Sequence, residues 1–157
     1  MLNEYLQFAS SRSVETTETF NLSKLLETTI MKYEKKEITT DISKEVFLDG
    51  RKNLMQRCFS NLIDNAIKYS ANVYISLRKL NNNILITIDD DGPGIPENER
   101  ENVFKPFYKI DKSRGDSKSS VGLGLSIASD TVKSHGGNIK LETSPTNGLR
   151  IKVILPF

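Results

Sequence analysis

The sequence predicts an α+β domain in which helices pack on one face of a single sheet. Two alternating runs, ANVYISLRKL and ILITIDD, flank an asparagine turn at residues 81–83 and indicate a β-hairpin. Two more strand candidates, NIKLETS and LRIKVILP, are joined by the turn PTNG. Strands outnumber helices, but three segments place apolar residues at helical spacing, and there is no internal repeat. We therefore expect one domain of the α+β class.

The composition indicates one soluble domain without a nucleic-acid or membrane partner. With 157 residues, 37% of them apolar, the chain is long enough for a hydrophobic core. A net charge of +2 and scattered basic residues do not favour nucleic-acid binding. The apolar runs are shorter than a membrane span, and the N-terminus lacks a signal-peptide pattern. The single cysteine, Cys58, excludes an intramolecular disulfide and fits a reducing compartment.

The first 19 residues are expected to precede the domain proper, which we place at residues 20–157. Residues 2–10 show the spacing of a short amphipathic helix. Residues 10–19 are rich in Ser, Thr and Glu, which is typical of a linker. The short helix is therefore interpreted as the end of another, truncated element.

The first part of the domain is predicted to contain one helix and two short strands. The helix begins at a cap formed by Asn21 or Ser23 and continues to about Lys36. The strands are expected at residues 37–42 and 46–48. These elements supply core residues and carry no chemical motif.

The predicted helix at residues 51–69 carries two asparagines within NLIDNAIKYS. At roughly 100° per residue, Asn65 falls inside the apolar arc and Asn61 at its border. A lone buried asparagine most often bonds a neighbouring loop, since an unpartnered amide is costly. Here both amides and Lys68 line one side, with Tyr69 four residues after Asn65, which suits a charged aromatic ligand. Amide oxygens also ligate Mg²⁺, which usually binds nucleotide phosphates.

The motif DDDGPGI directly follows the second hairpin strand. Gly92 and Gly94 permit close approach of a flat ligand. Asp90, at the strand end, is our candidate to accept a hydrogen bond from an exocyclic amine. A solvated turn or a cation site explains three consecutive aspartates equally well.

The motif SVGLGLSI places Gly122 and Gly124 at the start of the last helix, which stops at the glycine pair 136–137. Backbone N–H groups and the helix dipole at such a position suit a phosphate. Flexible loops carry the same pattern of glycines, so the motif alone is weak. It is not a dinucleotide fingerprint, and the chain contains no P-loop.

Residues 105–121 form a long segment that is interpreted as a lid or a disordered loop. Lys109 is one of its basic residues. Phe107 and Tyr108 are expected to anchor such a lid, while ordinary core packing explains Phe104 equally well.

In this order and separation, NLIDNAIKYS, DDDGPGI, FKPFY, SVGLGL and HGG resemble the N box, the F box and the three glycine boxes of bacterial sensor histidine kinases. The resemblance covers residues 20–157. It implies the catalytic, ATP-binding domain of the GHKL family, shared with gyrase B, the Hsp90 chaperones and MutL. The implied Bergerat fold is a two-layer α/β sandwich, three helices over a mixed, mainly antiparallel sheet, with ATP between helices and lid. Residues 2–10 resemble the end of the dimerisation and phosphoacceptor domain, and the subfamily looks EnvZ-like.

The resemblance implies ATP and Mg²⁺ as cofactors and a role for each matching residue. Asn65 ligates Mg²⁺ and Asn61 supports the same cluster. Asp90 reads the adenine amino group, and Lys109 reaches the terminal phosphate from the lid. The residues implied for the nucleotide site are Asn61, Asn65, Lys68, Tyr69, Asp90, Gly92, Gly94, Ile95, Phe107, Tyr108, Lys109, Gly122, Leu123, Gly124 and Leu125.

Two positions depart from the family pattern, and one motif is missing. Ser120 replaces an extra glycine that often opens the second glycine box, and Lys109 replaces an arginine, which loses a bidentate phosphate contact. The His-Glu box that holds the phosphoacceptor is absent. His135 belongs to the third glycine box and is expected to make a contact at the helix end instead. We therefore expect ATP·Mg²⁺ binding without autophosphorylation until a dimerisation domain is supplied.

Two other functions were considered. An ATPase of the gyrase or chaperone branch needs a carboxylate base four residues before the metal-binding asparagine, where this chain has Asn61. A non-catalytic, nucleotide-sensing module is compatible with the altered lid. By resemblance, the partners are the dimerisation domain and a response regulator. The fragment is expected to be a cytoplasmic monomer that belongs to a membrane-bound sensor kinase.

Overall fold

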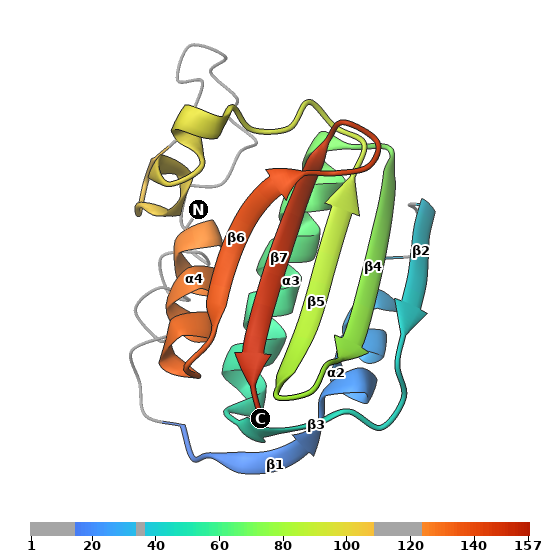
Figure 1. Ribbon diagram of the computed structural model, residues 1–157, viewed down its shortest axis with the longest axis vertical. Coiled ribbons are helices and arrows are strands. Elements are labelled where there is room, and N and C mark those ends of the chain that lie inside the picture. Colours follow the sequence, from blue (N-terminus) through green and yellow to red (C-terminus); the bar gives the residue numbers. More distant parts are fainter. Residues whose placement is uncertain (1–14, 34–36, 109–123) are drawn as a thin grey trace.

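The structure is a computed structural model that describes residues 15–33, 37–108 and 124–157. These residues form two layers, a five-stranded sheet and α-helices on one of its faces (Figure 1). The strand order is β2–β4–β5–β7–β6, with β2 parallel to β4 and the other neighbouring pairs antiparallel. The predicted α+β class and the mixed, mainly antiparallel sheet are confirmed.

The hairpin of residues 72–90 places Asp90, at the end of its second strand, on the face of the sheet that the helices cover. Val73 lies opposite Asp90, and the isoleucines at positions 84, 86 and 88 are at most 1% exposed against the helices. Because side chains alternate along a strand, Asp90 shares their face. The five strands are β2 (Glu37–Ile42), β4 (Asn72–Lys79), β5 (Asn83–Asp90), β6 (Asn138–Thr143) and β7 (Leu149–Pro156).

Within the described residues, the α-helices are α2 (Leu22–Ile30), α3 (Lys52–Tyr69) and α4 (Gly124–Ser134). Asn21 caps α2 as predicted, because its side-chain oxygen accepts from the Lys24 N–H at 3.0 Å. The predicted end of α2 near Lys36 is wrong. The helix ends at Ile30, where a tighter turn from the Lys32 N–H to the Thr29 carbonyl replaces the helical bonds.

A second, two-stranded sheet joins β1 (Glu18–Asn21) to β3 (Phe47–Gly50) in antiparallel register. Phe20 and Leu48 are opposite each other and both are buried. Glu18 and Thr19, which the sequence placed in a linker, belong to β1 but are exposed. Exposed polar residues carry no strand signal, so this element was missed. The division of the chain at residues 19 and 20 stays a prediction.

Helices α3 and α4 run in opposite directions across the sheet (Figure 1). The Cβ position of Gly124, at the start of α4, lies 3.9 Å from Asn61 Cβ. At the other end, Ser134 accepts a hydrogen bond from Arg51, the residue before α3. The first turn of α4 therefore lies beside the polar second half of α3.

The segment between β5 and α4 begins with two single-turn 3₁₀ helices, η1 (Glu97–Glu99) and η2 (Asn102–Phe104). None of the helices in the described ranges is long and apolar enough to cross a membrane.

Candidate functional site

Asn61 and Asn65, the two asparagines of NLIDNAIKYS on α3, are both half-buried. The Asn61 Nδ2 atom is buried and has no hydrogen-bond partner among the described residues. The helical wheel places Asn65 deeper than Asn61, and that ranking stays a prediction, while α4 begins beside Asn61. A buried amide without a partner costs roughly 1–3 kcal/mol. The Asn61 amide is therefore a strong candidate to meet a ligand or a residue outside the described ranges.

The last turn of α3 ends in two exposed residues that lie against each other. Lys68 Nζ is 5.4 Å from the centre of the Tyr69 ring, a cation–π contact. Tyr69 is 50% exposed, so most of a ring face is free to pack against a flat ligand. Lys68 and Tyr69 thus end the helix that carries Asn65, three and four residues after it.

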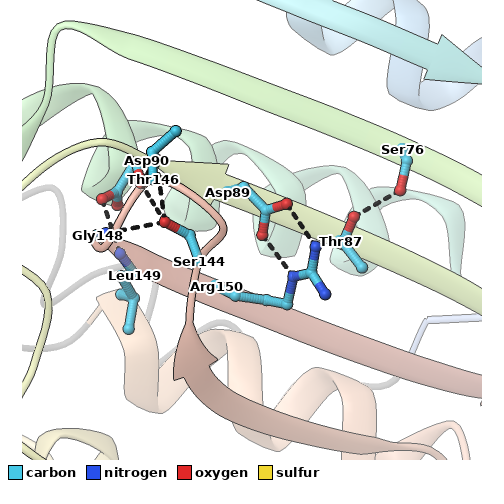
Figure 2. Close-up of polar contacts among 9 residues, drawn as sticks. All are labelled: Ser76, Thr87, Asp89, Asp90, Ser144, Thr146, Gly148, Leu149 and Arg150. Atoms are coloured by element: carbon cyan, nitrogen blue, oxygen red, sulfur yellow. Dashed lines mark hydrogen bonds and ion pairs between the residues drawn. The ribbon is translucent and has the colours of Figure 1, made fainter.

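Asp90 is buried at the end of β5, with 4% exposure, and its carboxylate is held from two sides, of which Figure 2 shows the side of Leu149. Its Oδ1 atom accepts from the Gly92 N–H at 2.9 Å and from the Leu149 N–H at 3.0 Å. Among the described residues, both hydrogen bonds to this carboxylate end on Oδ1. The second oxygen, Oδ2, is therefore the one that can accept from a ligand.

The glycines after β5 lie too close to neighbouring backbone for any larger residue. A Cβ atom at Gly92 would lie 2.3 Å from the Tyr69 carbonyl oxygen. Gly94 has a φ of +72°, and a Cβ there would lie 3.3 Å from the Gly148 carbonyl oxygen. Gly92 therefore joins the Asp90 loop to the end of α3, and Gly94 joins it to the turn between β6 and β7.

Asp91 fixes the same junction from the outside. Its Oδ1 accepts from the backbone N–H groups of Ala71 and Asn72, at 2.9 and 3.0 Å, and its Oδ2 accepts from the Asn72 amide at 2.8 Å. These hydrogen bonds, the Asn72 backbone bond first, lower the pKa of Asp91. The carboxylate therefore ties the end of β5 to the turn that follows Tyr69.

The side chains at the start of the predicted lid differ in how exposed they are. Phe104 and Ile95 are half-buried against the core, so packing is confirmed for Phe104. Phe107 is 56% exposed and has a φ of +67°. Tyr108 donates its hydroxyl to Glu99, and this hydrogen bond raises the pKa of Tyr108. Within the described residues, Phe107 is the ring of this group that is open to a ligand or partner.

The phosphate end of the site is described only in part. Gly124 and Leu125 begin α4, and Leu125 packs against the core. The other predicted residues of this region, Lys109, Gly122 and Leu123, lie outside the described residues. Gly124 thus begins α4 beside Asn61, and the N-terminal end of a helix favours an anion.

His135 makes the predicted contact at the end of α4. Its Nε2 accepts from the Arg51 N–H at 3.0 Å, so the proton is on Nδ1, which donates to the Thr131 carbonyl at 2.7 Å. Burial is the main cause that lowers the pKa of His135, and this keeps the ring neutral. Both ring nitrogens are engaged, so neither is free as a nucleophile.

Sequence reasoning missed the residues that hold Asp90 in place. Ser144 and Thr146, in the turn between β6 and β7, both donate to the Asp90 carbonyl oxygen, at 2.7 and 3.1 Å (Figure 2). Gly148 lies against the same residue. The sequence showed PTNG only as a strand connection. Hydroxyl residues flanking such a turn were the available signal, because they bond backbone groups readily.

The family comparison places most of the chain in one known group. Residues 50–157 match the sequence profile described as "Histidine kinase-, DNA gyrase B-, and HSP90-like ATPase". The match spans α3, the Asp90 loop, α4 and the last two strands. It begins just before the asparagine helix and so includes every predicted site residue.

Similar curated proteins are bacterial sensor kinases. The chain is 37% identical to the sensor histidine kinase CpxA of Escherichia coli K12 over 111 residues, which are 70% of this chain and 24% of CpxA. It is 37% identical to the sensor-like histidine kinase SenX3 of Mycolicibacterium smegmatis over 122 residues, 76% of this chain and 32% of SenX3. The chain thus spans about a quarter to a third of the length of these relatives.

Solved structures share the fold over nearly the whole chain. The mycobacterial sensor histidine kinase MprB superposes with a TM-score of 0.80 at 24% identity, covering 90% of this chain and 97% of the other. The ATP-binding domain of PrrB from Mycobacterium tuberculosis has a TM-score of 0.73 at 27% identity, covering 89% and 96%.

Proposed function

The chain belongs to the histidine kinase-, DNA gyrase B- and HSP90-like ATPase family, and on that premise we propose how it uses its nucleotide. It is a catalytic, ATP-binding domain of the sensor histidine kinase type. We propose that it binds ATP with Mg²⁺ and presents the terminal phosphate to a histidine on a dimerisation domain outside this chain. The observation that carries the proposal is the junction at Gly92, which joins Asp90 to the end of the asparagine helix.

The base end of the proposed site is the Asp90 carboxylate. An adenine amino group donates hydrogen bonds, and an ionised carboxylate only accepts them. Since Oδ1 is occupied by two backbone N–H groups, Oδ2 is the oxygen we assign to the adenine. Gly92 and Gly94 bring backbone, rather than side chains, to this face of the pocket.

The phosphate end is formed by α3 and the start of α4. No group of three or more His, Cys, Asp or Glu side chains within the described residues is arranged to hold a metal ion. An amide oxygen from Asn65 fits Mg²⁺, a hard cation that takes most of its remaining ligands from phosphates and water. The orphaned Asn61 amide lies one helical turn away and fits a role beside the same ion and phosphates. Lys68 adds a point charge for a phosphate.

Phosphoryl transfer depends on positioning and charge neutralisation more than on covalent chemistry by the protein. Bound Mg²⁺ supplies charge neutralisation on the phosphates. This chain's residues orient the base through Asp90 and the phosphates through α3 and the α4 N-terminus. The described residues supply no free histidine, because both nitrogens of His135 are engaged in hydrogen bonds. The acceptor must therefore come from another domain.

ATP hydrolysis by this chain is disfavoured by the chemistry of α3. The position that needs a carboxylate base is occupied by Asn61. Asp64, the only acidic residue of α3, is exposed and accepts from the Tyr33 hydroxyl at 2.6 Å. The Asn61 amide cannot serve as a general base, and Asp64 is engaged by Tyr33 rather than placed at the position that needs the base.

The remaining parts of the proposal concern the parent protein. We propose that the chain works with its own dimerisation domain and a response regulator, in the cytoplasmic part of a sensor kinase. The similarity to CpxA and SenX3 supports this assignment.

The experiment that tests this function is phosphoryl transfer from γ-labelled ATP. The chain alone should remain unlabelled, and it should label an added dimerisation domain from the same parent kinase. A control with Asp90→Asn should lose the labelling of the added domain. Efficient labelling of the isolated chain on His135 would contradict the proposal.

A further inference from the structure

We propose that Ser144 and Thr146, in the turn between β6 and β7, are positioning residues that orient Asp90 and thereby set the preference for an adenine base. The inference rests on the function proposed above, in which Asp90 accepts from the adenine amino group. The two hydroxyl residues do not touch the base themselves. They act on it through the backbone and carboxylate of Asp90.

The backbone of Asp90 is held by both hydroxyl groups at once. Ser144 Oγ donates to the Asp90 carbonyl oxygen at 2.7 Å, and Thr146 Oγ1 donates to the same oxygen at 3.1 Å. A carbonyl oxygen has two lone pairs, and both are used here. The peptide plane that follows Asp90, which leads into the glycine loop, is therefore fixed by the turn.

The carboxylate is held by the backbone at the end of the same turn. The Leu149 N–H donates to Oδ1 at 3.0 Å, while the Gly92 N–H reaches Oδ1 from the other side. Gly148 N–H in turn donates to Ser144 Oγ at 2.9 Å, so the serine also aligns the peptide before Leu149. Ser144 is 4% exposed, which protects these hydrogen bonds from water.

The turn between β6 and β7 packs closely against Asp90. A Cβ atom at Gly148 would lie 2.1 Å from the Asp90 carbonyl oxygen and 2.6 Å from Oδ1. With Oδ1 held in this way, rotation of the carboxylate is blocked and Oδ2 keeps one direction. The direction of Oδ2 therefore sets the preference of the pocket. A purine amino group can donate a hydrogen bond to Oδ2, and a carbonyl group at the same position cannot.

Closure of the hairpin alone does not account for these contacts. Backbone bonds already close the turn, from the Ser144 N–H to the Gly148 carbonyl and from the Asn147 N–H to the Ser144 carbonyl, each at 3.0 Å. Thr146 is exposed at the turn, yet its hydroxyl is directed back to Asp90 (Figure 2). If the Thr146 hydroxyl served only to close the turn, a hydrogen bond from it to Asp90 on β5 would not be expected.

The test is the ratio of affinities for ATP and inosine triphosphate, which carries an oxygen in place of the amino group. Affinities are measured on the 157-residue chain by displacement of a fluorescent ATP analogue. We expect wild type to prefer ATP and Asp90→Asn to lose that preference. Ser144→Ala and Thr146→Val should each lower the ratio about fivefold, the effect of about one hydrogen bond. Thr146→Ser, which keeps the hydroxyl, should retain the wild-type ratio.

The matched control is Ser76→Ala, since Ser76 bonds Thr87 on the opposite face of the sheet and does not contact Asp90. It should leave the ratio unchanged, even where it lowers the melting temperature. An unchanged ratio in folded Ser144→Ala and Thr146→Val, together with a changed ratio in Asp90→Asn, would overturn the positioning role and leave the proposed function intact. A wild-type chain that binds both triphosphates equally would overturn the adenine contact of Asp90 and with it the positioning role, and a chain that binds neither would overturn the proposed function as well. Because Thr146 is exposed, its variant should fold even where Ser144→Ala does not.

Discussion

The guanidinium of Arg51 closes the last turn of α4, because its Nη2 donates to the carbonyl and hydroxyl oxygens of Ser134 at 2.9 and 2.6 Å. Arg51 is also the residue before α3, and its backbone N–H bonds His135. One residue thus joins the start of the asparagine helix to the end of the helix whose first turn lies beside Asn61. This junction sets how the two site helices lie relative to each other.

The junction is expected to weaken at acidic pH. Burial lowers the pKa of His135 below its ordinary value of 6.5, so the folded state holds the ring neutral. Below that ordinary value, the unfolded chain binds a proton that the folded chain does not, so stability falls as the pH drops through the folded pKa. Arg51, which also lowers the pKa, and Glu15, which raises it, face the ring. We expect the free energy of unfolding to fall as the pH drops below the ordinary histidine pKa of about 6.5. In His135→Gln, which removes the titrating group, urea denaturation should show a smaller fall.

Glu15 is expected to stabilise α3 from outside the helix. Its two carboxylate oxygens accept from the Asn53 and Leu54 N–H groups, at 2.9 and 3.1 Å, while α3 has no acidic residue in its first turn and no side-chain cap of its own. Glu15→Gln should therefore cost about 1 kcal/mol of unfolding free energy. Glu18→Gln, on exposed β1, is the matched control and should be close to neutral. Equal effects of the two changes in urea denaturation would contradict the capping role.

Gly148→Ala should destabilise the chain because the added Cβ meets the Asp90 backbone at 2.1 Å. Overpacking of this kind costs roughly 1–3 kcal/mol. Gly124→Ala is the comparison, since its nearest contact of 3.9 Å is an ordinary one and alanine is favourable in a helix. Thermal melts should separate the two variants clearly. A melting temperature for Gly148→Ala equal to that of wild type would show that the turn does not press on Asp90.

Arg150→Gln should cost more stability than Arg78→Gln. Arg150 forms a bidentate pair with Asp89 at 2.7 and 2.8 Å, and the Asp89 side chain is only 8% exposed (Figure 2). The hydrogen bonds to Asp89 raise the pKa of Arg150. Loss of the partner of a buried carboxylate costs roughly 2 kcal/mol, and an exposed pair contributes about 0–1 kcal/mol. Arg78 and Asp41 form such an exposed pair, with side chains 45% and 47% exposed. Equal losses in urea denaturation would contradict this ranking.

The sequence predicted the fold where a local pattern exists, and it named the residues of the candidate site, whose roles stay predictions. Period-two alternation predicted the β4–β5 hairpin, with Asp90 at the end of its second strand. The orphaned Asn61 amide is the kind of costly feature that the sequence already indicated on α3. These patterns depend only on residues that are close together in the sequence, so they can be recognised without a structure.

What the sequence did not predict depends on contacts between distant residues. Ser144 and Thr146 reach Asp90 across more than 50 positions, and Glu15 reaches α3 across nearly 40. Contacts of this kind leave no local pattern in the sequence, because the two partners come together only in the folded chain.

The central claim is that an asparagine on α3 binds Mg²⁺ together with ATP, and calorimetry with a non-hydrolysable ATP analogue tests it most directly. Titrations with and without Mg²⁺ are compared for wild type, Asn65→Ala and the control Asn53→Ala, an exposed asparagine at the other end of the same helix. We predict that Mg²⁺ strengthens binding to wild type and to Asn53→Ala, and that this gain is largely lost in Asn65→Ala. An unchanged Mg²⁺-dependent gain in folded Asn65→Ala would contradict the metal assignment.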